Sequence, residues 1–235
     1  MEKPNYGIDA LPVVRNLGVI GITASVLFVL SYVVDVFGGF RYMFLSFAGS
    51  FSITSLLMIL YAKIGKFRHR DRMLGLVEWR GDEQVLDIGT GRGLLMIGAA
   101  KRLTSGHATG IDIWNAGDLS GNRKENTLKN AELEGVASKI TIGDEDARKL
   151  SFADESFDVV LSNLCLHNIP DKDGRRNACR EIARILKPTG TVVLSDFKSN
   201  SLYESTFKEL GMKTSRSFPA IFNTFPPLTI LTARK

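Results

Sequence analysis

A glycine-rich turn directly after an apolar segment is the part of the chain best suited to bind a ligand. Residues 85–93 read Val-Leu-Asp-Ile-Gly-Thr-Gly-Arg-Gly, so glycine stands at every second position from Gly89 onward. Glycine adopts backbone angles that other residues avoid and has no Cβ, so such a turn brings its backbone close to a ligand. Asp112 stands 19 residues beyond Gly93, and an acid that ends a second strand can accept both hydroxyls of a ribose. The pair predicts a site for a nucleotide-like ligand with a free ribose diol.

The spacing of the glycines separates two classes of ligand. A dinucleotide fingerprint has the form Gly-x-Gly-x-x-Gly or Ala, but the residue three places after Gly91 is Leu94, and the third glycine comes one place earlier. A nicotinamide-dependent reductase would also use a Tyr-x-x-x-Lys pair, and Tyr203 is followed four places on by Phe207. The pattern therefore disfavours NAD. An NAD(P)-dependent reductase with a Rossmann fold stays as an alternative, as does a nucleotide-binding membrane scaffold without catalytic activity.

The motifs between about residues 85 and 197 resemble those of the class I S-adenosylmethionine-dependent methyltransferases, with a type 11-like methyltransferase domain. The first motif of that family, acid-x-Gly-x-Gly-x-Gly, is met by Asp87 and the three glycines that follow it. Four further features occur in the order and at the spacing of the family. They are Asp112 at the end of the second strand, the pair Asp146 and Ala147 after the third strand, the fourth strand at 156–163, and a helix that ends in Arg-Ile-Leu-Lys-Pro-Thr-Gly-Thr at 184–191.

The resemblance implies S-adenosylmethionine as the cofactor and a role for each motif. The amides of the glycine turn would face the methionine part, and Asp87 would orient the turn or reach the cofactor's amino group. Asp112 would hold the ribose, while Asp146 would accept from the adenine amine, unless a shift of register gives that role to Asp144 or Glu145. Ala147 would offer its backbone to the adenine, and the side chain at the end of the fourth strand would line the floor near the sulfonium. The candidate cofactor-binding residues are Asp87, Gly89, Thr90, Gly91, Gly93, Asp112, Ile113, Asp146, Ala147 and Asn163.

His167 is the candidate catalytic residue. Methyl transfer from a sulfonium is an in-line displacement with a good leaving group, so the protein chiefly has to align the acceptor and exclude water. A base helps when the acceptor is a hydroxyl or a protonated amine, and histidine titrates near neutral pH. A hydrogen bond to the backbone is the alternative role for this side chain. The Asn-Pro-Pro-Tyr type of sequence used on amino groups of bases or glutamine is replaced by Ser-Asn-Leu-Cys at 162–165, which favours a small-molecule or lipid acceptor.

Alternating strands and helices must position these residues. Strands alternating with helices indicate a parallel sheet with helices on both faces, and the resemblance adds a last antiparallel pair at 213–217 and 228–233. The predicted fold is α/β, a Rossmann-like doubly wound sheet of seven strands, mostly parallel with the last strand antiparallel. The Phe-Pro-Pro at 225–227 must form a loop. Strands are predicted at 84–89, 107–113, 139–144, 157–163 and 191–197, and helices at 93–103, 122–134, 173–186 and 200–210.

Two uncharged apolar runs near the start of the chain are typical of membrane helices. Residues 16–34 and 42–62 form runs of 19 and 21 residues without a charge. At about 1.5 Å per residue each run spans roughly 30 Å, the thickness of a bilayer core. Buried helices of a soluble protein would need more covering than this small domain offers. A cleaved signal peptide does not fit the polar stretch before the first run and the second run directly after it. We expect transmembrane helices at about 16–36 and 42–62.

The charges around these runs predict their orientation. Only Asp35 to Arg41, with one charge of each sign, joins the two runs, so both outer ends should lie on the same side. Five Lys or Arg residues between 63 and 72 are opposed only by Asp71. Positive loops stay in the cytoplasm, so the N-terminus and the catalytic domain should face the cytosol.

The excess of basic residues lies beside the membrane. The net charge is +5, yet residues 81–235 carry 21 Lys or Arg against 20 Asp or Glu. Basic residues next to a membrane attract anionic lipid, by about 1 kcal/mol each, whereas a nucleic-acid site needs a basic stripe. Nucleic acid is therefore a disfavoured substrate. Cys165 and Cys179 are too few for a disulfide framework and have no metal-ligand spacing, so we expect reduced thiols and no metal.

The chain is thus expected to have three parts. Residues 1–63 form a membrane hairpin, 64–80 a basic linker with a lead-in helix at 68–79, and 81–235 a methyltransferase domain. A long polar loop at 114–122 borders the ribose side and is a lid, a substrate contact or a solvated loop. The predicted function is a membrane-anchored methyltransferase that moves a methyl group from S-adenosylmethionine to a small-molecule or lipid acceptor.

Overall fold

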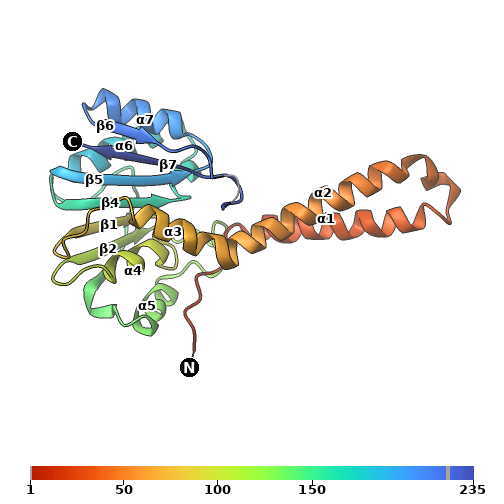
Figure 1. The fold of residues 1–235 in the computed structure, drawn as a ribbon, viewed down its shortest axis with the longest axis horizontal. Coiled ribbons are helices and arrows are strands. Elements are labelled where there is room, and N and C mark those ends of the chain that lie inside the picture. Colours follow the sequence, from red (N-terminus) through yellow and green to blue (C-terminus); the bar gives the residue numbers. More distant parts are fainter. Residues whose placement is uncertain (1, 221–222) are drawn as a thin grey trace.

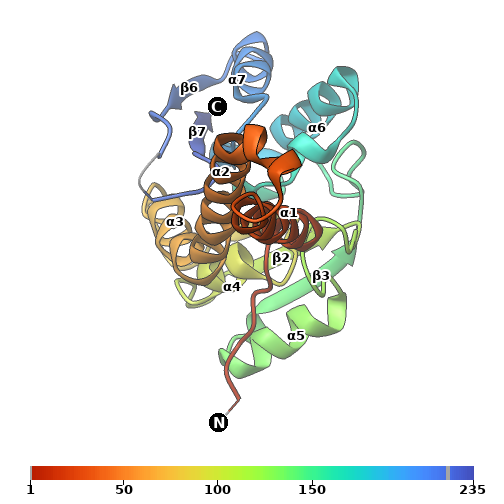
Figure 2. The same cartoon turned by 90° about the vertical axis from the view of Figure 1, so that its right-hand side faces the viewer.

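A computed structural model of the chain describes residues 2–220 and 223–235. It consists of an α/β domain and a long helical hairpin that extends from the domain at one end of the strands (Figure 1). Seen along the hairpin, the two hairpin helices lie near the middle of the outline of the domain (Figure 2).

The sheet of the domain has seven strands in the order β3-β2-β1-β4-β5-β7-β6. Neighbouring strands from β3 to β5 are parallel, and β7 runs antiparallel to both β5 and β6. This topology confirms the predicted α/β fold with a single antiparallel strand near the end of the chain. The strands are β1 (Gln84–Ile88), β2 (His107–Asp112), β3 (Ile140–Asp144), β4 (Phe157–Asn163), β5 (Leu186–Asp196), β6 (Lys213–Arg216) and β7 (Thr229–Arg234).

Helices cover both faces of the sheet because both faces are apolar. Successive side chains of a strand point to opposite faces, so Val85 belongs to the apolar core on one face and Leu86 to the core on the other. The loop predicted at 225–227 is a loop in the structure, and the predicted strand at 191–197 begins earlier, at Leu186. The helices of the domain are α3 (Lys66–Leu74), α4 (Leu94–Ala100), α5 (Lys124–Leu133), α6 (Lys172–Ile185) and α7 (Asn200–Glu209), with short 3₁₀ turns at Ala137–Lys139 and Leu166–Asn168.

The hairpin is formed by α1 (Leu11–Leu30) and α2 (Arg41–Leu60), joined by a 3₁₀ turn at Asp35–Phe40. The first helix begins and ends earlier than the predicted range of 16–36. Proline at the second position favours a helix start there, so the helix extends beyond the uncharged run that served to predict it. The two helices approach closely, since a Cβ on Gly21 would lie 2.4 Å from Ser52 Oγ and Ser55 Oγ donates a hydrogen bond to the Val14 carbonyl.

The second hairpin helix continues into the domain. One π-helical turn at Tyr61–Gly65 connects α2 to α3, so a single helical rod replaces the linker and separate lead-in helix expected at 64–80. Two contacts fix this rod. His69 Nε2 lies 2.6 Å from Ser195 Oγ in β5, and Lys66 Nζ donates to the carbonyls of Tyr6 and Gly7. These contacts bury Lys66. The sequence suggested that the basic residues of this segment attract anionic lipid, and Lys66 is not placed to do so.

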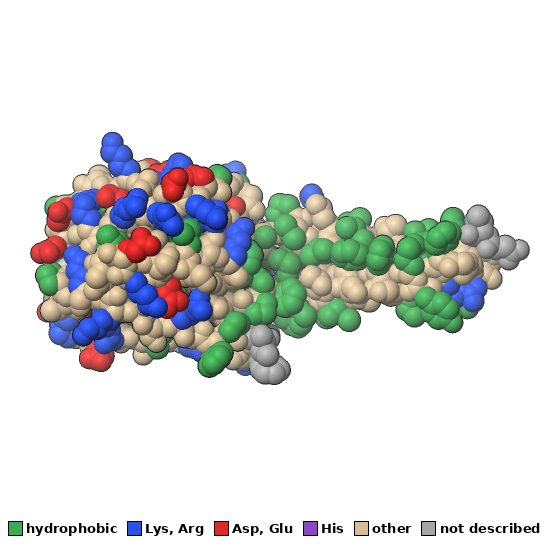
Figure 3. Space-filling view, turned by 90° about the horizontal axis from the view of Figure 1, so that it is seen from above, with side chains coloured by type: hydrophobic (Ala, Val, Ile, Leu, Met, Phe, Trp, Pro, Cys, Tyr) green, Lys and Arg blue, Asp and Glu red, His purple; other side chains and the backbone are tan. Residues whose placement is uncertain are grey.

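The apolar side chains of the hairpin are mostly exposed. Both helical segments are long and apolar enough to cross a bilayer, yet only 17% and 11% of their most apolar stretches are buried. Hydrophobic side chains cover the hairpin, whereas charged side chains gather on the domain (Figure 3). A core helix of a soluble protein would be largely buried, so this exposure argues against that alternative.

Candidate active site

A cavity of about 560 Å³ opens at the carboxyl edge of the sheet, beside the base of the hairpin. Ligands of open α/β sheets bind at this edge. The structure brings most of the predicted site residues to its wall. Those that line it are Gly89, Gly91, Asp112, Ile113, Asp146, Ala147, Asn163 and His167. The predicted residues Asp87, Thr90 and Gly93 lie behind this wall and support it.

The glycine turn forms a cradle that side chains would fill. Gly89 and Gly91 have φ of 72° and 54°, in the left-handed region that favours glycine. A Cβ on Gly89 would lie 2.3 Å from Cys165 Sγ, and one on Gly91 would lie 2.8 Å from a Leu119 methyl carbon. The amides of Gly89 and Thr90 both donate to the Ile111 carbonyl. The turn therefore allows close approach of its backbone to a ligand. The sequence suggested that the amides of the turn face the methionine part of the cofactor, but the amides of Gly89 and Thr90 already donate to Ile111.

Asp87 holds the glycine turn against α4, the helix that follows the turn. Its Oδ2 accepts hydrogen bonds from Thr90 Oγ1 at 2.9 Å and from the Met96 amide at 3.0 Å. The carboxyl is buried, and burial raises the pKa of Asp87 to about 7. Of the two roles predicted for Asp87, this geometry favours orientation of the turn.

Asp112 ends β2 and links the turn to the cavity. Its Oδ2 accepts the Gly91 amide at 2.8 Å, and its Oδ1 accepts the Trp114 amide at 2.7 Å and a longer bond from Asn122 Nδ2 at 3.3 Å. An ionised carboxylate has about four lone-pair sites, so one stays available toward the cavity. Asn122 Oδ1 is buried without a hydrogen-bond partner in the described part of the chain. The Asp112 carboxylate and the Asn122 Oδ1 are therefore suited to accept hydrogen bonds from ligand hydroxyls.

The acids after β3 divide between the cavity and its surroundings. Asp146 lines the cavity, and both of its oxygens accept from the Arg148 guanidinium. These hydrogen bonds lower the pKa of the Asp146 carboxyl. Asp144 contacts the Trp114 indole and Lys124 outside the cavity, while Glu145 lines it and accepts from Ser151. Of the acids considered from the sequence, Asp146 and Glu145 therefore face the site.

Polar groups without partners meet at the end of β4. Asn163 Oδ1 and the Tyr61 hydroxyl are buried, and within residues 2–220 and 223–235 neither reaches hydrogen-bond geometry. The Tyr61 hydroxyl approaches the Asn163 amide, so the two groups face one part of the cavity. Next to them, burial and the carboxylates of Asp112 and Asp87 raise the pKa of the Cys165 thiol above its ordinary value. The thiol stays neutral and is unsuited to act as a nucleophile.

His167 lies on the cavity wall beside a buried acid. Its Nδ1 is 2.9 Å from Asp196 Oδ1, an ion-pair distance without in-line hydrogen-bond geometry. The imidazole packs edge to face against Phe197, with 4.7 Å between ring centroids. Asp196 is itself held by the Phe197 amide and the Tyr203 hydroxyl. A histidine oriented by a fixed carboxylate can accept a proton in the cavity.

Sequence reasoning missed Asp196 and the contribution of the N-terminal segment. Asp196 ends β5 as Asp112 ends β2, and this shared position was the available signal. The segment before α1 lies alongside the loop at 114–122. Ile8 donates to Ser120 Oγ and accepts from the Ser120 amide, and the Ala10 amide donates to the Asp118 carbonyl. The loop lines the cavity and is held by this segment. The segment itself has no hydrophobic period that would have revealed its place.

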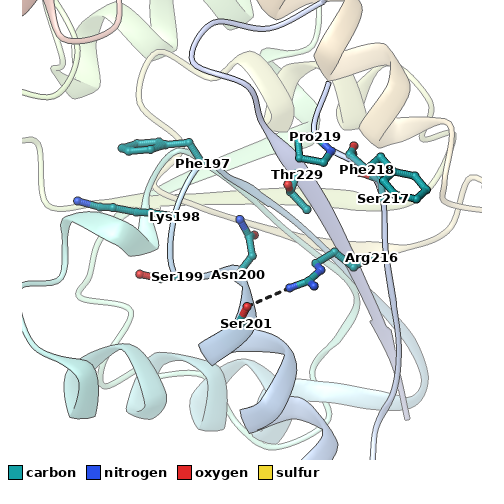
Figure 4. A pocket seen from close by; sticks show the side chains of 10 residues that line it. All are labelled: Phe197, Lys198, Ser199, Asn200, Ser201, Arg216, Ser217, Phe218, Pro219 and Thr229. Atoms are coloured by element: carbon teal, nitrogen blue, oxygen red, sulfur yellow. Dashed lines mark hydrogen bonds between the residues drawn. The ribbon is translucent and has the colours of Figure 1, made fainter. Parts of the chain in front are cut away.

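A second cavity, of about 490 Å³, shares Phe197 with the first and lies between the start of α7 and the loop after β6 (Figure 4). Arg216 points across it and donates to Ser201 Oγ at 3.1 Å. The Arg216 guanidinium is also 3.3 Å from Glu204. Within the described residues the wall of this cavity includes none of the predicted site residues. Phe197, which both cavities share, packs against His167. The geometry thus places the candidate chemistry in the first cavity.

Comparison with known proteins agrees with this geometry. Residues 86–194 match the family model described as a methyltransferase domain. The chain is 33% identical over 131 residues to 27-O-demethylrifamycin SV methyltransferase of Amycolatopsis mediterranei, covering 55% of this chain and 44% of that protein. It is 29% identical over 174 residues to demethylmenaquinone methyltransferase of Tropheryma whipplei, covering 74% and 65%. The chain thus spans about half to two thirds of the length of these curated relatives.

A solved structure shows the same fold. The structure of a SAM-dependent methyltransferase from Aquifex aeolicus superposes with a TM-score of 0.56 at 14% identity, covering 70% of this chain and 88% of the other. Such a low identity supports the fold alone. The family match and the methyltransferases among the relatives support S-adenosylmethionine as the cofactor. Residues 86–194 therefore match a methyltransferase domain, and the sheet that contains them has the fold of an S-adenosylmethionine-dependent methyltransferase.

Proposed function

We propose that the whole chain is a membrane-anchored methyltransferase that moves a methyl group from S-adenosylmethionine to a small-molecule or lipid acceptor. The observation that carries this proposal is that the glycine turn and the base of the apolar hairpin line one and the same cavity. The cofactor supplies an electrophilic methyl group on a sulfonium. The residues of the chain supply binding, orientation and the exclusion of water.

The residues present fit the cofactor. Glycine at position 89 leaves room for Cys165 to pack against the turn, while the backbone of the turn lines the cavity. Asp112 and Asn122 direct acceptor oxygens toward the cavity, as a ribose diol requires. Asp146 and Ala147 would meet the adenine at the end of β3, and Asn163 would lie near the sulfonium.

The chain then aligns the acceptor with the methyl group. His167, oriented by Asp196, would take a proton from an acceptor hydroxyl or ammonium as the new bond forms. Phe197 and the loop at 223–228 shield this position from water. Proton removal and water exclusion are the contributions that a displacement with a good leaving group needs from the protein.

The hairpin would anchor the enzyme with its domain and N-terminus in the cytosol. Both outer ends of the hairpin lie next to the domain, and the basic residues after the second apolar run favour the cytoplasmic side. Lys63 and Arg68 remain exposed and can contact anionic lipid, unlike the buried Lys66.

The cofactor assignment is tested by calorimetric titration of the full-length protein in detergent micelles with S-adenosylmethionine and, separately, with NADH. We expect micromolar binding of S-adenosylmethionine alone. Binding of NADH instead would support a reductase, and binding of S-adenosylmethionine without methyl transfer to any membrane or soluble acceptor would support a scaffold.

The orientation is tested with single cysteines in the full-length chain. Gly39 lies in the hairpin tip with nothing within 4 Å of its Cβ position, and Lys235 lies at the end of the domain. A membrane-impermeant maleimide added to intact cells should label Gly39→Cys and should label Lys235→Cys only after permeabilisation. The reverse pattern, or labelling of both in intact cells, would contradict the proposed topology.

A further inference from the structure

We infer that the base of the hairpin is one wall of the acceptor site, which takes an amphipathic lipid with a hydroxyl-bearing head directly from the bilayer. This inference rests on the proposed function and names its substrate class. We define the hairpin root as Ala10 and Val13 at the start of α1 and Met58 and Tyr61 at the end of α2. All four residues line the cavity that contains the glycine cradle.

The cavity has a polar half and an apolar half, set by the strand order. β2 and β3 lie at one side of the edge, where the polar residues Asp112, Glu145 and Asp146 line the wall. β4, β5 and β7 lie at the other side, where most lining residues are apolar and the polar ones are Asn163, His167 and Asn168. Its apolar residues, with those of the hairpin root, are Ile169, Pro170, Phe197, Phe225, Pro226, Val13, Met58 and Tyr61. The polar half suits the nucleoside of the cofactor, and the apolar half suits a hydrocarbon acceptor.

The apolar half reaches the level of the bilayer. Met58 belongs to the uncharged run at 42–62 and precedes Lys63 by five residues, which is about 7.5 Å along the helix axis. A basic residue marks the interface, where its charge stays in water. The cavity wall therefore includes a residue inside the apolar layer, and a lipid can pass from this layer into the cavity without crossing water.

The hairpin root is fixed over the cavity. A Cβ on Gly65 would lie 2.8 Å from the Asn223 carbonyl, so the loop before β7 packs directly on the helical rod. Lys66 holds the N-terminal segment, and the Ala10 amide donates to the loop at 114–122. These contacts lie directly before α1 and directly after α2, so the hairpin root is fixed to the folded domain at both helices.

A polar group at the apolar half would receive the head of the lipid. The buried hydroxyl of Tyr61 and the buried Oδ1 of Asn163 have no hydrogen-bond partner in the described parts of the chain. A buried polar atom without a partner is unfavourable, and a ligand group that pairs with it removes this cost. A hydroxyl on the acceptor can accept from Tyr61 and donate to Asn163, and it then lies on the wall shared with His167. Tyr61 is accordingly an acceptor-positioning residue.

The test uses full-length protein in vesicles of phosphatidylethanolamine and phosphatidylglycerol that contain hexadecanol with a diazirine next to its hydroxyl end. After illumination, mass spectrometry maps the cross-linked residues. We expect cross-links in the segments 166–170 and 223–228, beside the hairpin root. Met58→Trp, which fills the opening, should reduce them at least five-fold. The matched control Ile53→Trp lies on the same helix, 59% exposed and outside the cavity wall, and should leave them unchanged.

S-adenosylmethionine binding is measured on the same samples and reports folding of each variant. If Met58→Trp loses this binding, Val13→Trp on the other helix serves as the blocking variant. Cross-links confined to exposed hairpin residues such as Ile22, or undiminished by the blocking variant, would overturn the inference. Loss of cofactor binding in the unsubstituted protein would instead overturn the proposed function, while the cross-link map would still report on the lipid site.

Discussion

Asp196 holds His167 from the end of β5, with 2.9 Å between Oδ1 and Nδ1. The carboxylate is buried and is fixed by the Phe197 amide and by Tyr203. The imidazole is partly open to the cavity, with 12% of its side chain exposed. A fixed carboxylate behind a partly exposed imidazole is the arrangement by which proteins orient a general base.

Replacement of this base is expected to reduce turnover and leave cofactor binding intact. His167→Gln should lower methyl transfer to a hydroxyl acceptor by about 100-fold or more, because general-base catalysis contributes roughly that factor. The assay follows the tritiated methyl group of S-adenosylmethionine into the lipid extract of vesicles made from total membrane lipid. The control is His107→Gln, which removes a histidine that contacts Thr141 away from the cavity. Full turnover of His167→Gln would leave this residue a structural role.

Removal of the acid at the end of β2 is expected to weaken cofactor binding. Asp112→Ala should raise the dissociation constant for S-adenosylmethionine at least ten-fold, since hydrogen bonds to a charged group contribute about 1.5–3 kcal/mol each. Asp112→Asn keeps an acceptor for the Gly91 amide and should have an intermediate effect. The control Asp82→Ala changes an exposed acid before β1. Calorimetry on the full-length protein gives the constants, and equal affinities for all four proteins would refute the role of Asp112.

The base of the nucleoside provides a test for the acids after β3. Asp146→Ala should reduce the preference for S-adenosylhomocysteine over S-inosylhomocysteine, because the inosine analogue lacks the exocyclic amine. Asp144→Ala should keep this preference, since Asp144 lies outside the cavity. The ratio of the two dissociation constants is the measurement. A loss of preference in Asp144→Ala alone would assign adenine recognition to the other register.

Two glycines with similar backbone angles allow the effect of backbone strain to be separated from the effect of a steric clash. Gly89 and Gly135 have φ of 72° and 71°, so alanine is strained at both, by about 1–2 kcal/mol. A Cβ on Gly135 meets nothing within 4 Å, whereas one on Gly89 meets Cys165 at 2.3 Å. Gly135→Ala should bind S-adenosylmethionine normally with a slightly lower melting temperature, and Gly89→Ala should lose binding. Equal binding by both variants would show that the cradle does not hold the cofactor.

The buried carboxyl of Asp87 predicts a pH dependence of stability. Burial raises its pKa to about 7 from 3.8, so between these values the folded chain keeps a proton that the unfolded chain has lost. Stability therefore falls as pH rises across this window and the loss stays constant above it, at about 4 kcal/mol as an upper limit. Asp87→Asn does not titrate and keeps an acceptor for Thr90. The melting temperature of Asp87→Asn minus that of the unsubstituted protein should therefore increase as pH rises from 4 to 7. A difference that is constant with pH would contradict the raised pKa.

The sequence predicted the sheet well because its strands repeat a local signal. Each buried strand is a short, mostly apolar run. Asp112 and Asn163 end β2 and β4, and Gly89 directly follows β1. The parallel order of the strands brings these ends to one edge. Fold and cofactor therefore follow from patterns that extend over only a few residues each.

The acceptor half of the site depended on packing that a sequence does not record. An apolar run does not tell which of its side chains face a cavity, so in the sequence Met58 and Tyr61 look no different from their exposed neighbours. The contacts of Ile8 and Ala10 use backbone groups, which every residue has. The basic run was also ambiguous, because Lys66 contacts buried carbonyls and only a structure separates it from exposed cations.

The unbroken helix from the second apolar segment into α3 gives the proposed enzyme a fixed height above the membrane. A flexible tether would let the domain turn and sample acceptors at any distance from the surface. A rod held at His69 by Ser195 and at Lys66 by two carbonyls prevents such turning. In the proposed enzyme the methyl group would then be presented at one depth only. Among lipids of similar chemistry, the proposed enzyme would select those whose reactive atom lies at that depth.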